Sequence, residues 1–302
     1  MLTIRDLEEK LPGLPVFAHA PMSEHTTFRI GGPADLLAMP RSEAELAELL
    51  ALARERETAI LVMGRGANLL VSDDGVRGLV IKTLPGLSGL SRRGTNELIA
   101  EAGVPLYRLA EAAADFGLSG LAFAHGIPGT VGGALSMNAG AYWGEMSQVV
   151  REVHALSSDG RSLPLGRDEL DFSYRHSYFS DNPAIVATRA VLELSPGNKE
   201  SIRGEMERLS VMRASAQPLG IPSAGSVFKR PPGHYAGKLI QDCGLLGAAV
   251  GGAQVSEKHA GFILNRGGAT CDDVKRLIAR IQRQVLSRTG VALECELRYI
   301  GG

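Results

Sequence analysis

The chain has 302 residues, of which 44% are hydrophobic and 22% charged, and a formal net charge of −1 at pH 7. These values are typical of a globular protein with room for two domains of ordinary size, and the near-zero charge gives no electrostatic case for binding nucleic acid. No uninterrupted apolar stretch approaches the roughly 20 residues that span a bilayer, so we expect no membrane insertion.

The N-terminal sequence and the cysteines both indicate the cytoplasm. The stretch MLTIRDLEEK lacks the basic start and apolar run of a secretory signal. Cys243, Cys271 and Cys295 are widely spaced and form no CxxC pair. Such spacing suits a reducing compartment and favours neither a disulfide framework nor a zinc site. We therefore predict a cytoplasmic protein.

Four segments show the apolar periodicity and the end signals of helices. The first begins at Ser42 and Glu45, which form a capping pattern, and the second ends at Gly117. The third covers 199–215, and the fourth covers 271–289 between a cap at Thr270 and a stop at Gly290. Their apolar faces are Leu46, Leu49, Leu50 and Ala53; Leu106, Leu109, Ala110 and Ala113; Ile202, Met206 and Leu209; and Val274, Leu277, Ile278, Ile281 and Val285.

Six segments between these helices are predicted to be strands. They are 59–63, 78–83, 97–103, 149–156, 184–194 and 291–300. Several lie close together and are separated by tight Gly/Asp turns, which favours α+β organisation over a doubly wound parallel sheet. The polar stretch SPGNKES at 195–201 is the best candidate for a domain boundary.

Glycine is in excess, at 37 residues where about 7% is usual, and it is concentrated in short stretches. GRGANLL at 64–70 follows a predicted strand, but Leu69 stands where a dinucleotide fingerprint needs its third glycine, and a turn and strand follow instead of a helix. A Rossmann site is therefore not expected. A turn cluster without a ligand explains this loop as well as a ligand site does.

The second glycine stretch is GIPGTVGGALSMNAGAYWGE at 126–145. Glycines let backbone N–H groups converge on an anion and let a flat ring approach the main chain, so a phosphate can be held without lysine. Two such loops suit an extended ligand with a pyrophosphate and a planar ring. Close packing at a crowded domain centre is the alternative explanation.

Other polar stretches are weaker signals by themselves. In 293–300 the alternation puts Glu294, Glu296 and Arg298 on one face, which usually means a solvated surface. Ser226 does not fit the GxSxG nucleophile elbow. The seven histidines show no HxxxH or HExxH spacing, so we predict no metal site.

Together these stretches resemble the UDP-N-acetylenolpyruvoylglucosamine reductases, flavoenzymes of bacterial cell-wall synthesis. The resemblance runs nearly end to end and in the family's order. Its motifs are TTFRIGGPAD at 26–35, GRGANLLVSDDGVRGLVI at 64–81, GIPGTVGGALSMNAGAYWGE, FSYRHSYF, PSAGSVFKRP at 222–231, GKLIQDCGLLG at 237–247, VSEKHAGFILN at 255–265 and the closing ECELRYIG.

The resemblance implies an FAD-binding domain of the vanillyl-alcohol oxidase and p-cresol methylhydroxylase type and a smaller α+β substrate domain. We place the FAD-binding region, with two α+β subdomains, at 1–197 and the substrate-binding domain at 198–302. The implied reaction is reduction of FAD by NADPH, followed by hydride transfer to the enolpyruvyl ether of UDP-N-acetylglucosamine to give UDP-N-acetylmuramate. The short interval from Tyr174 to Ser226 is similar to the shorter, type II form of the family.

The resemblance also assigns roles to residues. It makes Ser226 the proton donor and carries two further catalytic roles onto Arg175 and Glu296. Substrate contacts are implied for Tyr174, Arg175, Lys229, Arg230, His259 and Glu296. FAD contacts are implied for Gly64, Arg65, Gly66, Ala67, Asn68, Leu69, Gly126, Ile127, Pro128, Gly129, Thr130, Gly132, Gly133, Asn138, Ala139 and Gly140.

These residue types suit the implied chemistry. Hydride arriving at the terminal carbon of an enol ether builds enolate character beside the carboxylate, and that charge must be stabilised and then protonated. Arg175 can bind the carboxylate as a fork. Glu296 can hydrogen-bond the same oxygens if burial or Glu294 raises its pKa. Ser226 then gives the proton, with help from Lys229 or loop amides.

Four positions depart from the family's usual pattern. Ala67 replaces a serine in the first glycine loop, and Ala216 replaces a lysine before Gln217, so a phosphate contact to UDP or NADPH is missing or comes from Arg213. Arg230 stands where asparagine is frequent, and Cys295 replaces the proline before Glu296. None of them is one of the three catalytic positions.

Two rival functions stay open at this point. A flavin oxidase of the same superfamily would act on an alcohol or phenol and use oxygen as acceptor. A flavin- or nucleotide-binding module would bind its ligand without turnover. The three hypotheses differ in whether NADPH bleaches the flavin and in what restores its colour.

Overall fold

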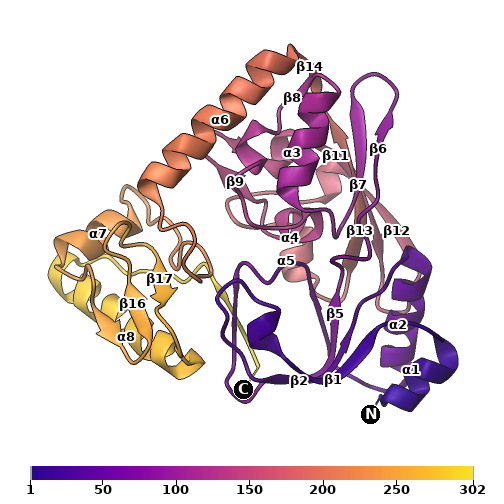
Figure 1. Ribbon diagram of the computed structural model, residues 1–302, viewed down its shortest axis with the longest axis horizontal. Coiled ribbons are helices and arrows are strands. Elements are labelled where there is room, and N and C mark those ends of the chain that lie inside the picture. Colours follow the sequence, from indigo (N-terminus) through magenta and orange to yellow (C-terminus); the bar gives the residue numbers. More distant parts are fainter. Residues whose placement is uncertain (1, 302) are drawn as a thin grey trace. The chain divides into compact units, whose positions relative to one another are not determined.

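The computed structural model of the protein describes residues 2–301 (Figure 1). These residues form two compact units, each made of three stretches of chain. Unit 1 contains residues 2–18, 36–65 and 78–213, and unit 2 contains residues 19–35, 66–77 and 214–301.

The centre of unit 1 is a five-stranded antiparallel sheet in the order β12-β11-β13-β7-β6. Hydrophobic residues of β7, including Leu98 and Ala100, alternate with more exposed ones, as expected for a sheet covered on one face. The strands are β6 (Leu90–Arg93), β7 (Glu97–Glu101), β11 (Val150–Leu156), β12 (Ser162–Gly166) and β13 (Val186–Glu193).

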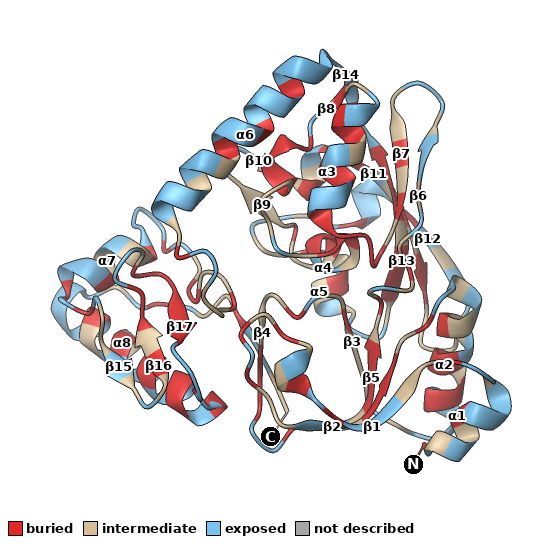
Figure 2. Cartoon of the chain, viewed as in Figure 1, coloured by how far each residue is buried: buried red, intermediate tan, exposed pale blue. Residues whose placement is uncertain are grey.

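Helices pack on this sheet and close the core of unit 1. The helix α4 (Val131–Ser136) contacts β13 and β7, and α3 (Leu106–Asp115) buries its apolar face in the same cluster. The long helix α6 (Lys199–Ala216) adds Ile202, Met206 and Leu209 to that cluster. Figure 2 shows α6 with one buried stripe and an otherwise exposed surface.

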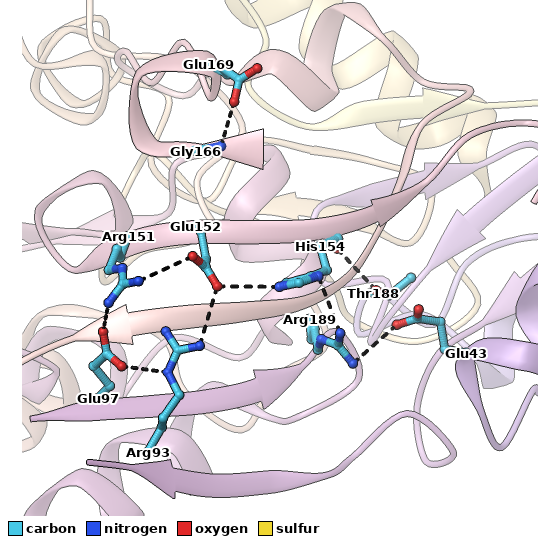
Figure 3. Close-up of polar contacts among 10 residues, drawn as sticks. All are labelled: Glu43, Arg93, Glu97, Arg151, Glu152, His154, Gly166, Glu169, Thr188 and Arg189. Carbon is cyan, nitrogen blue, oxygen red and sulfur yellow. Dashed lines mark hydrogen bonds and ion pairs between the residues drawn. The ribbon is translucent and has the colours of Figure 1, made fainter. Parts of the chain in front are cut away.

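A polar network lies along the strands of the same sheet (Figure 3). Glu97 pairs with Arg93 and Arg151, and Glu152 pairs with Arg93 and with His154 Nε2 at 3.4 Å. His154 Nδ1 accepts a hydrogen bond from Arg189, which also approaches Glu43. Most of these side chains are partly exposed, so we treat the network as a modest stabiliser of the sheet.

The sheet β1-β2-β5-β3 and its helices account for a second apolar cluster of unit 1. The strand β3 runs parallel to β5, and Leu79 and Ile81 of β5 are fully buried. The elements are α1 (Ile4–Lys10), β1 (Val16–Pro21), β2 (Pro33–Ala38), α2 (Glu43–Glu55), β3 (Ile60–Met63) and β5 (Val76–Lys82), and the unit boundaries fall within β1, β2 and β5.

Unit 2 is built around the helix α8 (Cys271–Thr289). Its buried stripe packs with Phe28, Leu70, Val227 and Val255 in one cluster. Asp73 accepts hydrogen bonds from the N–H groups of Cys271 and Asp272, which are otherwise unpaired at a helix start. The other elements are β4 (Leu69–Val71), which pairs in parallel with β18 (Arg298–Ile300), α7 (Ala236–Asp242), and the antiparallel β15 (Ala249–Val250), β16 (Ala253–Val255) and β17 (Ile263–Asn265).

Short elements complete the chain. They are the 3-10 turns η1 (Met22–Glu24), η2 (Ala122–Ala124), η3 (Met146–Gln148) and η4 (Arg167–Glu169), the helix α5 (Tyr178–Asp181), and the two-residue strands β8 (Leu118–Ser119), β9 (Gly140–Ala141), β10 (Gly144–Glu145) and β14 (Ser195–Pro196). Within residues 2–301 no helix is long and apolar enough to cross a membrane.

The four predicted helices and the α+β class are confirmed. The fourth helix matches residue for residue, with the Thr270 side chain accepting from Asp273 N and Gly290 in the left-handed conformation. The predicted strand at 291–300 is wrong over most of its length, because only β18 pairs as a strand and Cys295 forms an isolated bridge with Phe228.

The predicted domain boundary at 197/198 differs from the division into units. The chain passes from unit 1 to unit 2 after Arg213, because α6 buries its apolar stripe in the core of unit 1. Segments 19–35 and 66–77, which precede 197, belong to unit 2. The polar stretch at 195–201 therefore lies within unit 1, where it forms β14 and the start of α6.

Candidate functional site

The two glycine stretches meet inside unit 1. A Cβ on Gly64 would lie 2.1 Å from Oγ1 of Thr130, so no larger residue fits at 64 without moving the second stretch. Thr130 is buried and ends the extended backbone before α4. Residues 64 and 130 approach this closely because Gly64 lacks a side chain. That the two stretches together bind one extended ligand stays a prediction.

The second stretch is less open than its glycines suggest. Its middle is the helix α4, and the N–H groups of Gly129, Val131 and Gly132 donate to carbonyls of unit 1. A Cβ on Gly132 would lie 3.0 Å from the Cβ of Ala102, so this glycine serves close packing. The N–H groups at these three positions are therefore not available to a ligand, because the backbone satisfies its own hydrogen bonds.

The end of the second stretch holds the turn that carries Tyr174 and Arg175. Buried Asn138 accepts from Ser147 N at 2.9 Å and donates to the carbonyl of Ser173 at 3.1 Å. Arg175 Nη2 donates to the carbonyl of Gly140 at 3.2 Å, and its guanidinium lies 5.2 Å from the centre of the Tyr174 ring. Three residues assigned to FAD or substrate from the sequence are thus neighbours: Asn138, Gly140 and Arg175.

A partly buried cation lies at the start of the second stretch. A Cβ on Gly126 would lie 2.8 Å from Cδ of Arg213, and Arg213 Nε is buried without a hydrogen-bond partner in the described chain. Burial lowers the pKa of Arg213, yet a guanidinium stays charged in proteins. An orphaned donor on a cation beside a glycine loop fits an anionic ligand group.

In unit 2, Ser226 and Glu296 are on neighbouring backbone segments. Glu296 N donates to the carbonyl of Val227 at 2.8 Å, and Val227 N donates to the carbonyl of Gly261 at 2.9 Å. Ser226 Oγ donates to the carbonyl of Phe228 at 3.4 Å, a long hydrogen bond that leaves the hydroxyl easy to redirect. These bonds place the two backbone segments side by side, and the prediction that Ser226 and Glu296 work together stays a prediction.

The first glycine stretch touches the same segment through Asn68. Asn68 Nδ2 donates to the carbonyl of Glu296 at 3.1 Å, and the carbonyl of Asn68 accepts from Arg298 N at 2.9 Å. This contact continues into the parallel pairing of β4 with β18. A residue assigned to FAD thus fixes the backbone of a residue assigned to catalysis.

The His259 ring and the Ser226 hydroxyl both lie close to Gly261. A Cβ on Gly261 would lie 3.0 Å from the His259 ring and 3.4 Å from Ser226 Oγ. His259 Nδ1 accepts the N–H of Gly261 at 3.1 Å, and burial lowers the pKa of the ring. A ring that accepts at Nδ1 and resists protonation is a neutral imidazole with its proton on Nε2.

The charged residues near Glu296 have partners. Lys229 pairs with the side chain of Glu294, and its backbone N–H donates to the Glu294 carbonyl at 2.9 Å. From the sequence, the Glu294 carboxylate was one group expected to raise the pKa of Glu296. Its charge is offset by Lys229. Arg230 stacks 4.1 Å from the centre of the Tyr235 ring, on exposed surface.

Among residues 2–301, one group brings three metal-ligand atoms within 4.8 Å of one another: Asp171, His176 and Asp181. His176 Nδ1 faces the carbonyl of Asp171 at 3.2 Å, and Nε2 faces Asp181 Oδ2 at 3.1 Å. A metal needs a bare lone pair on one ring nitrogen, whereas both nitrogens here face hydrogen-bond acceptors. We interpret the group as a cation held by two acceptors. Sequence reasoning missed it, because only the fold brings Asp181 to the ring.

Two family models match parts of the chain. Residues 217–300 match the model of the UDP-N-acetylenolpyruvoylglucosamine reductase C-terminal domain, and residues 34–166 match an FAD binding domain. The chain is 48% identical over 300 residues to the UDP-N-acetylenolpyruvoylglucosamine reductase of Caldanaerobacter subterraneus subsp. tengcongensis, covering 99% of this chain and 98% of that protein. The chain belongs to the UDP-N-acetylenolpyruvoylglucosamine reductase family.

Further members of this family are similar over the same length. The reductase of Pediococcus pentosaceus is 47% identical over 297 residues, covering 98% of each chain. The crystal structure of the reductase from Thermus caldophilus superposes with a TM-score of 0.82 at 36% identity, covering 95% of this chain and 99% of that one. The family and the FAD-binding domain expected from the sequence are confirmed.

Proposed function

We propose that this chain is an FAD-dependent reductase that takes hydride from NADPH and converts UDP-N-acetyl-3-O-(1-carboxyvinyl)-glucosamine to UDP-N-acetylmuramate, a peptidoglycan precursor. The observation that carries the proposal is the pairing of the Ser226 and Glu296 segments by the hydrogen bond from Glu296 N to Val227 O. This bond joins the segment of the proposed proton donor, Ser226, to the segment of the proposed carboxyl group, Glu296.

The two glycine stretches fit FAD. The proposed contacts are those assigned from the sequence, over 64–69 and 126–140, with Arg213 Nε added as a donor to an anionic group. Gly129, Val131 and Gly132 use their own N–H groups internally, so the side chains of Arg213 and Arg65 carry more of the anion binding than the sequence suggested. FAD, when bound, supplies the carrier that takes hydride from NADPH and delivers it to the substrate.

Arg175 binds the substrate carboxylate in this proposal. Its guanidinium is already oriented by the Gly140 carbonyl and the Tyr174 ring, so little side-chain entropy is lost on binding. Negative charge grows on the carboxylate side of the enol ether as hydride arrives. A guanidinium fork stabilises that charge better in the transition state than in the ground state.

Ser226 and Glu296 complete the reaction. Glu296, in its protonated form, donates a hydrogen bond to the enolate oxygens, and Ser226 Oγ gives its proton to the carbon beside the carboxylate. A hydroxyl is a weak acid, so this step relies on a strongly basic enolate. Tyr174, Lys229, Arg230 and His259 are proposed to bind the rest of the UDP-sugar. A cytoplasmic location and the lack of nucleic-acid binding stay predictions.

Anaerobic titration tests the proposed function. NADPH is expected to bleach the flavin absorbance, and the enolpyruvyl sugar nucleotide is expected to restore the oxidised spectrum. A flavin oxidase would instead be reoxidised rapidly by oxygen without any UDP-sugar. A binding module would stay yellow with NADPH. Failure of the sugar nucleotide to restore the spectrum would contradict the proposal.

A further inference from the structure

The turn that carries Arg175 has an unfavourable backbone. Ser173 and His176 exchange two backbone hydrogen bonds of 3.2 Å, which close the turn around Tyr174 and Arg175. Arg175 has φ +57° and Asp171 has φ +44°, in the left-handed region that residues with a Cβ adopt at a cost. Two such residues within five positions require other contacts to hold the turn in this shape.

The ring of His176 supplies two of these contacts. Nδ1 lies 3.2 Å from the backbone carbonyl of Asp171, and Nε2 lies 3.1 Å from Oδ2 of Asp181 in α5. A carbonyl oxygen and a carboxylate oxygen can only accept. Both ring nitrogens must carry a proton for both bonds to exist together, so the pair of bonds is complete only in the imidazolium.

The charges around the ring favour that cation. The carboxylates of Asp171 and Asp181 face it, with Asp171 Oδ2 3.9 Å from Nδ1. α4, the helix that packs against α5, has the sequence VGGALS and carries no titratable side chain. On the turn itself, the Arg175 guanidinium is engaged with Gly140 and Tyr174. The hydrogen bond to Asp181 is the main cause that raises the pKa of His176 above its ordinary value of 6.5.

We propose that the His176 imidazolium is a positioning residue that clamps the Arg175 turn between Asp171 and α5, so that its protonation state sets how well Arg175 meets the substrate carboxylate. The inference rests on the proposed role of Arg175. It adds a residue that touches neither substrate nor cofactor but controls one that does.

The clamp has a defined pH dependence. Loss of one ring proton removes one of the two hydrogen bonds and the charge that Asp181 attracts. Because the pKa of folded His176 lies above 6.5, the clamp is complete below that value and is lost as the pH rises through the raised pKa. The consequence falls on the step that uses Arg175, the reduction of the substrate, and not on flavin reduction by NADPH.

Stopped-flow absorbance of the holoenzyme measures the two steps separately. We would compare wild type with His176→Gln and Asp181→Asn from about pH 5.5 to about pH 9, across the range in which histidine titrates. His154→Gln is the matched control, because it removes a histidine of the same unit that contacts Glu152 and Arg189 in the sheet network. FAD content and the thermal midpoint are recorded for every variant.

The expected results are specific to a clamp. His176→Gln should slow substrate reduction about tenfold below neutral pH, as the loss of a charged hydrogen bond predicts, and should remove the decline toward alkaline pH. Asp181→Asn should move that decline to lower pH, since the amide keeps an acceptor but loses the charge. Flavin reduction by NADPH, FAD content and the His154→Gln profile should stay as in wild type.

Two outcomes overturn the proposal. One is a His176→Gln variant with the wild-type rate and pH profile. The other is a variant that loses FAD or slows in both steps together, which makes His176 a structural residue. The Asp181→Asn variant is an independent test. If its rate of substrate reduction declines at the same alkaline pH as in wild type, the clamp is also contradicted.

A failure of the proposed role of Arg175 gives a different result. If Arg175→Ala keeps full substrate reduction, that role is wrong, whereas the titration of His176 followed by NMR is unaffected. If Arg175→Ala slows the step as proposed, His176→Gln should slow it little further in the Arg175→Ala background. An undiminished effect there would mean that His176 does not act through Arg175.

Discussion

Glu296 N–H donates a hydrogen bond of 2.8 Å to the carbonyl of Val227, the residue that follows Ser226 in the chain. The next bond along the same pair of segments runs from Lys229 N to the carbonyl of Glu294 at 2.9 Å. Two residues with proposed catalytic roles are thus fixed on one short strand-like pair.

Glu296 is expected to work as a hydrogen-bond donor. Glu296→Ala should slow substrate reduction by about 10²–10³-fold, the usual effect of removing one donor to a developing oxyanion. Glu296→Gln should slow substrate reduction much less, because the glutamine amide N–H₂ still donates a hydrogen bond. The measurement is single-turnover reoxidation of the reduced flavin, with exposed Glu205→Gln on α6 as the control. Equal losses in Gln and Ala would mean that Glu296 works as a carboxylate.

Gly64 is expected to be needed for FAD binding because it makes room for Thr130. Gly64→Ala places a methyl group 2.1 Å from Thr130 Oγ1 and should weaken FAD retention. The control is Gly204→Ala, whose Cβ would have no heavy atom of the described residues within 4 Å. FAD affinity is measured by flavin fluorescence during dilution. The double variant Gly64→Ala/Thr130→Gly should recover affinity, and its failure to do so would argue against the clash.

Asp273 is expected to protect unit 2 against acid. Its carboxylate accepts from Thr270 N and Gly252 N at 3.2 Å each, and these bonds hold its pKa below the ordinary 3.8. Its contribution to the free energy of unfolding is therefore present above pH 3.8 and is lost as the pH falls through the lowered pKa. Urea unfolding at several pH values should show a shallower acid loss for Asp273→Asn. An identical slope in the variant would contradict this prediction.

Local signals determined how much of the fold could be predicted. The helix 271–289 was predicted in full because Thr270, Asp273 and Gly290 act on neighbouring residues. The strand 291–300 was overpredicted because alternation is local, whereas pairing depends on a distant partner that only 298–300 finds in β4. Asp73 caps α8 from another part of the chain, and no pattern near residue 271 announces it.

Some residues of the candidate site were likewise assigned before the structure was known, and others became visible only in the fold. Ser226, Arg175 and Glu296 were assigned through the family resemblance and stay predictions. The sequence pattern alone placed Glu296 on a solvated face, did not fit Ser226 to a nucleophile elbow and gave no role to Arg175. The amides of Gly129, Val131 and Gly132 looked free in the sequence but are used by the fold. His176 was not singled out, because the acceptors that require its charge are visible only in three dimensions.

The most direct test of the account is the Ser226→Ala variant in the two separated half-reactions. Flavin reduction by NADPH should stay nearly normal, because Ser226 takes no part in it. Reoxidation of the reduced flavin by the enolpyruvyl sugar nucleotide should slow by several orders of magnitude, because the proton donor is gone. If both half-reactions fall together, or if reoxidation keeps its wild-type rate, Ser226 is not the proton donor.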